Sequence, residues 1–543
     1  MDMADSNEGI LPAPDAGRAA PVPAAWAPAH NPWLIASVVA LSAFMEMLDA
    51  SIANVALPHM AGSLSSSNDE ATWILTSYLV ANAIILPLSG WISNTIGRKK
   101  YFLLSLLLFT VSSVLCGLAP SLSAIILFRV LQGAGGGGLQ PVAQAILADS
   151  FPESKRGQAF AMYGITTVLA PIIGPTLGGW ITDNYSWRWI FFINIPVGIL
   201  TLMLVEQLVE DPPYLRLMAR KAVKIDFIGI GLLSVGIAAL QVVLDKGQED
   251  DWFGSHFILT LTLVATVALG ILIFWEWFHD HPVIDVRLFK HFNFLTSNLM
   301  MFGFGVMMFG TLVMMPLYLQ TLMGYTAESA GLVMSFGGLF VLLELPMVGR
   351  LLGKVQARRL VHVGWAAMAI GMWFSTRHMD TLISFRAGSW IRVLQMVGLP
   401  FLFVPLTTVV YVGLPKEKNN SISALINFMR NIGMSFGTSI VTTILARRAQ
   451  FHQQVLVSHL YPGNVYSSES LNMLSQALFH SGLSATGALN QAYGRFYQGV
   501  VVQAYSLAYI DGYQVFAIGA AVFFVLSFFL KGNRPHAPSG PME

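Results

Sequence analysis

The chain has 543 residues, of which 55% are hydrophobic and only 11% are charged. Soluble domains carry about 25% charged residues, so this composition excludes an ordinary soluble protein and indicates a membrane protein. The formal net charge of +1 argues against a nucleic-acid partner, and the single cysteine, Cys116, excludes an intramolecular disulfide or a cysteine zinc cluster.

Residues 1–32 are rich in alanine, proline and acidic residues. They lack the basic region and short apolar core of a signal peptide, so we expect a disordered cytoplasmic tail. After this tail come fourteen segments with the roughly 20 mostly apolar residues that a membrane-spanning helix needs. In chain order they are residues 33–57, 72–94, 101–119, 122–146, 157–181, 187–208, 225–245, 256–278, 293–320, 327–350, 359–377, 386–412, 420–446 and 511–531.

Lysine and arginine gather in every second loop between these segments, beginning with the run RKK at residues 98–100. Because short basic loops stay in the cytoplasm, the alternation predicts that both chain ends are cytoplasmic, including a second tail of residues 532–543. Arg447 and Arg448, at the outer end of the thirteenth segment, go against the alternation.

The longest predicted outer loop covers residues 447–510 and is rich in glutamine, serine, tyrosine and histidine. Within it, residues 471–478 and 488–502 look amphipathic. We expect these stretches either to pack on the membrane surface or to meet a partner protein.

An internal repeat divides the chain into two halves. The word RVLQ occurs at residues 129–132 and 392–395, each time inside an apolar segment, where an arginine costs at least about 2.5 kcal/mol and usually lines a pathway. LPLSG at 86–90 matches LPMVG at 345–349, and the spacing fits only if two helices are inserted between two six-helix bundles. We therefore predict an all-α transporter with a 6 + 2 + 6 arrangement of fourteen helices. The predicted units are residues 33–210, 211–290 and 291–531.

Longer stretches carry a resemblance to a known family. They read LDASIANVALP at 48–58, TSYLVANAIILPLSGW at 76–91, APIIGPTLGGWITDNYSWRWIFFINIP at 170–196 and LDKGQEDDWF at 244–253. On these motifs the chain, from about residue 33 to 530, resembles the fourteen-helix drug:H⁺ antiporters of the major facilitator superfamily (EmrB/QacA type), and most nearly their EmrB branch. The resemblance implies that superfamily's fold and proton-coupled export of hydrophobic drugs across a bacterial inner membrane.

The resemblance also implies partners and structural motifs. EmrB-type pumps work with a periplasmic membrane-fusion adaptor of the EmrA type and an outer-membrane channel of the TolC type, so both are expected partners. A gating motif between the second and third helices contains Gly90, Asn94, Gly97 and Arg98, and the antiporter motif of the fifth helix contains Gly174, Pro175, Gly178 and Gly179. Asn94 stands where the family often has an acid, which weakens the expected lock with Arg98.

Three intramembrane acids are candidates for proton coupling. Asp49 comes first, because a buried acid on a membrane helix is typical of a proton relay and the resemblance places a functional acid there. Glu46 lies one turn earlier on the same helix face, where the two groups would titrate as a pair. Glu344 is predicted to bind a proton or a cationic substrate, with a stabilising pair to Arg350 as the alternative.

The two repeated arginines receive different roles. Arg129 is predicted to stabilise a deprotonated acid across the bundle and so to take part in proton coupling. Arg392 is predicted to bind substrate, although its side chain could also extend to the outer boundary. The other predicted substrate-binding residues are Gln395, Asn427, Arg430, Met308, Phe309 and Phe436. Methionine-rich surfaces adapt to many ligands, whereas contact with core or lipid is the alternative for such side chains.

The sequence indicates no enzyme, no metal site and no cofactor. The Gly-rich run at residues 133–138 lacks the Lys-Ser/Thr pair of a phosphate-binding loop, and no ATPase motif is present. An ion gradient or the substrate's own gradient must therefore drive transport. Open alternatives are a narrow-specificity exporter of a metabolite, fatty acid or siderophore, a nutrient symporter, and a receptor built on the same bundle.

Overall fold

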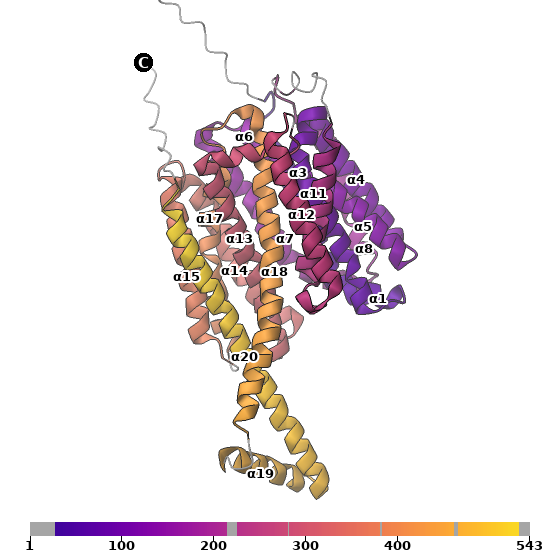
Figure 1. Ribbon diagram of the computed structural model, residues 1–543, viewed down its shortest axis with the longest axis vertical. Helices are drawn as coiled ribbons and strands as arrows, with labels where there is room; N and C mark the ends of the chain where they lie inside the picture. The colour runs from indigo at the N-terminus through magenta and orange to yellow at the C-terminus, as the bar shows by residue number, and fades with distance from the viewer. Residues whose placement is uncertain are drawn as a thin grey trace, which may run out of the picture.

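The computed structural model describes residues 28–213, 215, 225–280, 282–380, 383–460 and 465–530. All of the regular structure in these ranges is helical, as Figure 1 shows. Most of the predicted N-terminal tail (residues 1–27) and all of the predicted C-terminal tail lie outside the described residues.

The first half of the chain supplies six membrane-spanning segments, two of which are interrupted helices. They are α1 (Pro32–Ser63), α3 (Trp73–Ile96), α4 (Arg98–Leu118), α5 with α6 (Leu122–Gly136 and Leu139–Ser150), α7 (Glu153–Asn184) and α8 with α9 (Trp189–Phe192 and Asn194–Leu208). The single-turn helix α2 (Asn68–Ala71) precedes α3. The inserted pair that follows consists of α11 (Phe227–Lys246) and α12 (His256–Phe278).

The second half supplies six more spans. They are α13 (Phe292–Leu317), α14 (Ala327–Leu351), α15 (Ala357–His378), α16 with α17 (Phe385–Met396 and Gly398–Val409), α18 (Asn419–Ser458) and α20 (Ala485–Ser527). Twelve segments of the described chain are long and apolar enough to cross a membrane. The more polar α15 and α18 pack inside the same bundle, against α20 and α13. The prediction of fourteen spanning helices is confirmed.

The spans satisfy their own polar groups and present apolar side chains outward. Ser93 Oγ donates to the carbonyl of Ser89 (2.6 Å), and Thr407 Oγ1 donates to the carbonyl of Phe403 (2.7 Å). On α12, Leu263 and Phe274 are 65% and 68% exposed. A helix in hydrocarbon needs both features, because lipid offers no hydrogen bonds and favours apolar contact.

One hydrophobic core runs through both halves, and the halves meet along several helix pairs. In the first half α1 lies against α7, and in the second half α13 lies against α18. The contacts between the halves run along α7 with α14 and α17, and along α18 with α3 and α6. The inserted helix α11 contacts both α3 and α18, so it covers the second of these seams.

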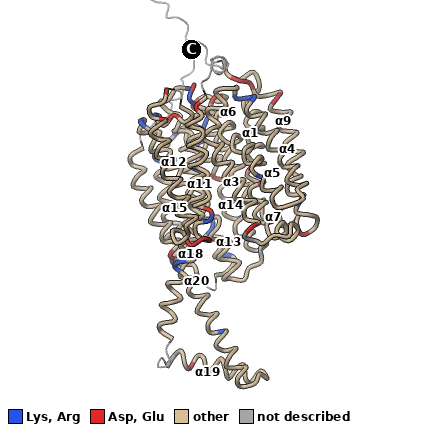
Figure 2. Tube along the Cα trace, turned by 45° about the vertical axis from the view of Figure 1, so that its right-hand side comes forward, with Lys and Arg blue, Asp and Glu red and all other residues tan. Residues whose placement is uncertain are grey.

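The predicted outer loop at residues 447–510 is largely helical. Residues 447–458 continue α18, which has 40 residues, and residues 485–510 begin α20, which has 43. With α19 (Val465–His480) across its tip, this helical hairpin projects from the bundle (Figures 1 and 2). The helix that contains the predicted span at residues 511–531 therefore begins earlier, at Ala485, because a helix that leaves the bilayer needs no apolar run.

The hairpin gives the molecule two distinguishable ends. We call the end from which α18 and α20 project the hairpin end (Figure 1). We call the opposite end, where α1 begins and α20 finishes, the terminal end. A 43-residue helix is about 65 Å long at 1.5 Å per residue, about twice the thickness of a bilayer core, so roughly half of α20 lies beyond the hairpin end.

Candidate functional site

A cavity of about 1070 Å³ lies between the two halves. Its walls come from α1, α3 and α7 of the first half, from α13, α14, α16 and α18 of the second half, and from the inserted helix α11. His59 and Asp183 line its outer part, where their side chains are 50% and 71% exposed. These residues end α1 and α7, so the cavity opens at the hairpin end.

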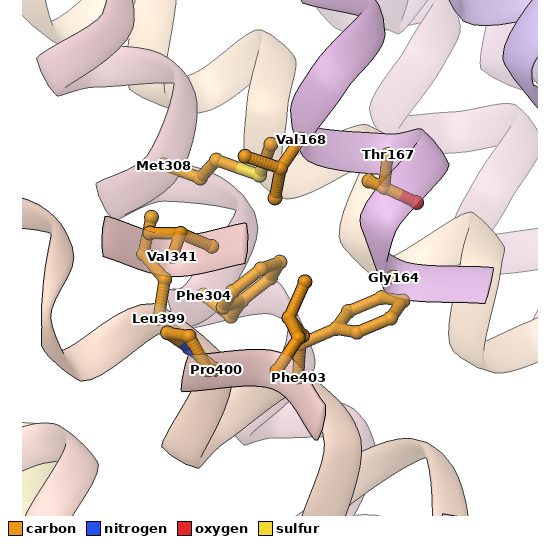
Figure 3. Close-up of a pocket in the computed structure, with 10 residues that line it drawn as sticks. Gly164, Thr167, Val168, Phe304, Met308, Val341, Leu399, Pro400 and Phe403 are labelled. Atoms are coloured by element: carbon orange, nitrogen blue, oxygen red, sulfur yellow. The ribbon is translucent and has the colours of Figure 1, made fainter. Parts of the chain in front are cut away.

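Apolar side chains close the floor of this cavity. A small pocket of about 10 Å³ lies there, between Gly164 and Thr167 of α7 on one side and Phe304 and Phe403 on the other (Figure 3). Val168 and Met308 line both the pocket and the large cavity. The pocket is therefore a packing gap in an apolar barrier beneath the cavity.

At the terminal end, polar side chains join the two halves. Arg98 donates from Nη1 to Asp149 (2.6 Å) and from Nε to Asn420 Oδ1 (2.7 Å). Asn420 in turn donates to Asn94 Oδ1 (2.6 Å). Gly90 lets the backbones approach, because a Cβ there would lie 2.9 Å from the Cα of Ser421. This end of the interface is closed.

Asp49 accepts three hydrogen bonds in the interior of the first half. Arg129 Nη1 donates to Oδ2 (2.7 Å), while Gln132 Nε2 (2.9 Å) and Asn194 Nδ2 (2.7 Å) donate to Oδ1. The guanidinium of Arg129 also lies over the ring of Tyr78, 4.1 Å from its centroid. Of the three donors, Arg129 also carries a positive charge, so its hydrogen bond to Asp49 is charge-assisted. Arg129 lines the cavity wall, and Asp49 lies behind it.

Glu46 faces the cavity and connects to the other half. Its Oε1 accepts a hydrogen bond from Asn82 (3.0 Å), and its buried Oε2 has no hydrogen-bond partner. Gln140 lies beside this carboxyl group and accepts a hydrogen bond from Arg430 of α18. Glu46, Gln140 and Arg430 thus form a polar path between the halves. Glu46 and Asp49 share no hydrogen-bond donor among the described residues.

A second polar contact between the halves joins two amides. Gln144 Nε2 donates to Asn427 Oδ1 (3.1 Å), and Asn427 Nδ2 donates back to Gln144 Oε1 (2.7 Å). Both side chains are buried. Asn427, predicted to bind substrate, therefore belongs to the interface beneath the cavity and does not line it.

This geometry agrees with the outcome of comparison with known proteins. The family model described as Major Facilitator Superfamily matches residues 39–438. The chain belongs to the major facilitator superfamily. It is a multi-pass membrane transporter of this superfamily.

Individual relatives extend the match over nearly the whole chain. The multidrug export protein EmrB of Escherichia coli (strain K12) is 38% identical over 507 residues, which cover 92% of this chain and 95% of EmrB. The fatty acid resistance protein FarB of Neisseria gonorrhoeae is 36% identical over 497 residues, covering 91% and 94%. The solved structure of the proton:xylose symporter XylE, bound to 6-bromo-6-deoxy-D-glucose, has the same fold, with a TM-score of 0.58, 15% identity and coverage of 92% and 96%. The expected EmrB-type family is confirmed.

The structure brings most of the predicted residues to this interface. Met308 and Phe309 line the cavity, as do Pro175 and Gly179 of the antiporter motif. The remaining motif glycines, Gly174 and Gly178, pack on α1, where added Cβ atoms would meet Ser51 and Ile52. Gly97, with φ at 96°, is the N-cap of α4 and precedes Arg98, which bonds to Asp149 and Asn420.

Three predicted residues lie elsewhere, and one of them, Gln395, donates to Ser375 inside the second half and does not line the cavity. Glu344 does not line the cavity, and its Oε2 is buried without a hydrogen-bond partner. Its side chain is half-buried, between the exposed Leu343 and the buried Leu345 of α14. Phe436 packs on Phe302 (ring centroids 5.4 Å apart) and does not line the cavity either.

Three polar residues of the site were missed in the sequence. Asn194 and Gln140 hold the two acids, and Asp245 of α11 lines the cavity and accepts a hydrogen bond from Thr76. Asn194 and Gln140 are polar residues inside apolar runs, and that rarity was the available signal, whereas Asp245 ends its apolar run beside a charged stretch and gave no such signal.

Proposed function

We propose that this protein exports hydrophobic, chemically varied toxic compounds across a bacterial inner membrane in exchange for protons. The observation that carries the proposal is the 1070 Å³ cavity between the halves, with Glu46 facing it and the Asp49–Arg129 pair in its wall. The similarity to EmrB, which is named a multidrug export protein, supports the same class of substrate.

The orientation follows from the charges at the two ends. Arg98 and Lys99 begin α4, Lys155 lies in the first turn of α7, Lys354 follows α14 and Lys418 precedes α18, so all five lie at the terminal end. The positive-inside rule places this end in the cytoplasm, with both chain termini. The cavity then opens to the periplasm, and the lock of Arg98, Asp149 and Asn420 closes the cytoplasmic side.

In this outward-open state the two acids have different tasks. Glu46 has an unpartnered oxygen at the cavity and takes up a proton from the periplasm. Protonation removes its attraction to Arg430 and weakens the polar path through Gln140, so the halves can rock and open toward the cytoplasm. Asp49 stays paired with Arg129 and hydrogen-bonded to Gln132 and Asn194, so it links α1 to the neighbouring helices of the first half.

A proton gradient supplies enough energy for this cycle. One charge that crosses 100 mV releases about 2.3 kcal/mol. At about 1.4 kcal/mol per tenfold concentration ratio, this supports an accumulation of about fortyfold per charge moved.

Proton release in proteoliposomes tests the proposal. Adding a hydrophobic substrate to the wild-type protein should trigger proton release, and Asp49→Asn and Glu46→Gln should each abolish it. Asp183→Asn, an exposed acid at the cavity mouth, is the matched control and should keep the signal. Release that persists in both variants contradicts the role of these two acids, and no flux with any compound contradicts proton-coupled export itself.

The projecting hairpin supports partnership with a periplasmic adaptor and an outer-membrane channel. It extends on the periplasmic side in the proposed orientation, and Leu489 and Tyr493 expose apolar surface one turn apart on α20 (39% and 56%). Arginine at both positions should remove drug resistance in cells while transport in proteoliposomes persists. Gln498→Arg, at another exposed position of α20, is the control. Resistance that survives the double change argues against an adaptor contact on this helix.

FarB supports a second candidate function within the same fold, a narrow-specificity exporter of fatty acids, because FarB is named a fatty acid resistance protein. A substrate panel separates the candidates. A multidrug exporter releases protons with dyes, antibiotics and fatty acids alike, whereas a narrow exporter responds to fatty acids alone.

A further inference from the structure

Arg392 is a buried cation without a counter-charge. Its side chain is 0% exposed, and Nη1 donates to the carbonyl of Thr311 and to Gln395 Oε1 (both 3.2 Å). Nε and Nη2 have no hydrogen-bond partner. Within the described ranges, no carboxylate lies within 4.0 Å of this guanidinium.

The repeated word RVLQ gives an internal comparison. In the first half, Arg129 pairs with Asp49 of α1, and Gln132 donates to the same carboxylate. In the second half, α13 contains no aspartate or glutamate, and Gln395 donates to the hydroxyl of Ser375 (2.9 Å). The same RVLQ sequence therefore contains an arginine with a carboxylate partner in the first half, Arg129, and, among the described residues, one without such a partner in the second half, Arg392.

No other ionisable side chain described near Arg392 supplies a negative charge to balance its guanidinium. Tyr513 is its ionisable neighbour, and a phenol is uncharged at neutral pH. Arg430 also has an unpartnered Nε, but it has Glu46 near it and Gln140 as an acceptor. An uncompensated buried charge is strongly unfavourable, so Arg392 needs an anion that comes from outside the protein.

The cavity brings such an anion to the right place. Arg392 and Met396, one turn apart on α16, both line it. Apolar side chains of the neighbouring helices α13 and α14 line the same region, namely Met308, Leu312 and Met334. A guanidinium at an apolar wall matches a molecule with an acidic head and an apolar body.

We propose that Arg392 binds the carboxylate of an amphipathic substrate whose apolar body lies against Met308, Leu312 and Met334. This inference rests on the proposed export function and adds a site and a substrate class, lipophilic carboxylic acids. The carboxylate supplies the counter-charge that Asp49 supplies to Arg129, and it accepts hydrogen bonds from the free Nε and Nη2.

The test compares an acid with its neutral ester on the full-length protein in nanodiscs. The probes are 1-pyrenebutyrate and its methyl ester, with binding followed by pyrene fluorescence. Arg392→Gln should raise the Kd of the acid relative to that of the ester by about tenfold or more, since a hydrogen-bonded charge pair contributes at least that much. Arg392→Lys should keep part of the preference, and Arg386→Gln, an exposed arginine on the same helix, should keep all of it.

A second variant separates binding from a purely structural role. Gln395→Glu places a carboxylate within 3.2 Å of Arg392 Nη1, so it should raise the melting temperature and still remove the preference for the acid. Equal changes in Kd for acid and ester in both variants would overturn the inference. So would a wild-type protein that binds the ester but not the acid.

Failure of this inference and failure of the proposed function are distinguishable. If the acid site is absent but export is real, neutral and cationic compounds still trigger proton release in proteoliposomes. If no compound triggers release, the export function itself fails, whatever the acid and ester do in nanodiscs.

Discussion

Asp49 and Arg129 form an ion pair whose side chains are both 1% exposed. Removing two such charges from water is costly, and their attraction offsets that cost only when the remaining lone pairs and protons are also satisfied. Gln132 and Asn194 satisfy Oδ1 of the carboxylate, so the pair is fully hydrogen-bonded on the acid side. A change that removes only one charge leaves the other one stranded.

Asp49→Asn should therefore lower the free energy of unfolding by about 3–5 kcal/mol, because Arg129 loses the one carboxylate with which it pairs in the described part of the chain. The double variant Asp49→Asn/Arg129→Gln should lose less than the sum of the two single changes. Thermal melting of the purified proteins in detergent compares the stability of the wild type, the two single variants and the double variant. Asp183→Asn, which changes an exposed acid, is the control. Additive losses would show that the two side chains act independently.

The inserted helix α11 is fastened to both halves at the cavity. On the first half, Thr76 donates to Asp245 and Lys246 donates to Thr72. On the second half, Gln241 and Ser435 exchange hydrogen bonds (2.9 and 3.1 Å). Rocking of the halves toward the other state must break one of these sets, so α11 is a connection that the transport cycle has to release.

Cross-linking α11 to α18 should therefore stop transport. With Cys116 replaced by serine, cysteines at Gln241 and Ser435 joined by a short thiol-specific linker should block export, and a reductant-cleavable linker should restore it on reduction. The matched control joins Gly236 to Leu269, a contact between α11 and α12 inside the inserted pair, and should leave transport intact. Export that continues across the Gln241–Ser435 link would mean that this contact persists through the cycle.

Hydropathy and the repeat were enough to predict the fourteen spans and the special place of Arg129, since an apolar run and an intramembrane charge are visible in the sequence. They did not predict that α18 continues to Ser458, because a helix beyond the bilayer carries no hydropathy signal. Which way a polar residue faces depends on how its helix is rotated in the bundle. Asn194 faces Asp49 for this reason, while Glu344 does not line the cavity.

At the scale of the whole molecule, the two ends of the interface differ in how the halves touch. At the terminal end backbones come close, with Gly90 of α3 against the first turn of α18. At the hairpin end the halves separate around the cavity. Alternating access requires that these two arrangements exchange, so the closed end must be held by contacts of limited strength.

Valine in place of Gly90 should favour the opposite state. Its Cβ would lie 2.9 Å from the Cα of Ser421 and 3.0 Å from the carbonyl oxygen of Asn420, and backbone atoms cannot move aside as a flexible side chain can. The halves must then part at the terminal end and close at the hairpin end. Asn54, an exposed residue of the cavity wall, provides the readout as a cysteine in the Cys116→Ser background.

In spheroplasts, a membrane-impermeant maleimide should label this cysteine quickly when Gly90 is present and several-fold more slowly in Gly90→Val. Gly270→Val on α12 adds the same side chain where no atom lies within 4 Å, so labelling there should be unchanged. Equal labelling in all three proteins would mean that the terminal end does not control the cavity mouth. Slower labelling in Gly90→Val alone would show that the two ends of the interface move together, as in a rigid-body motion of the halves. The reason is that Gly90 and Asn54 lie on different helices and at different ends of the interface.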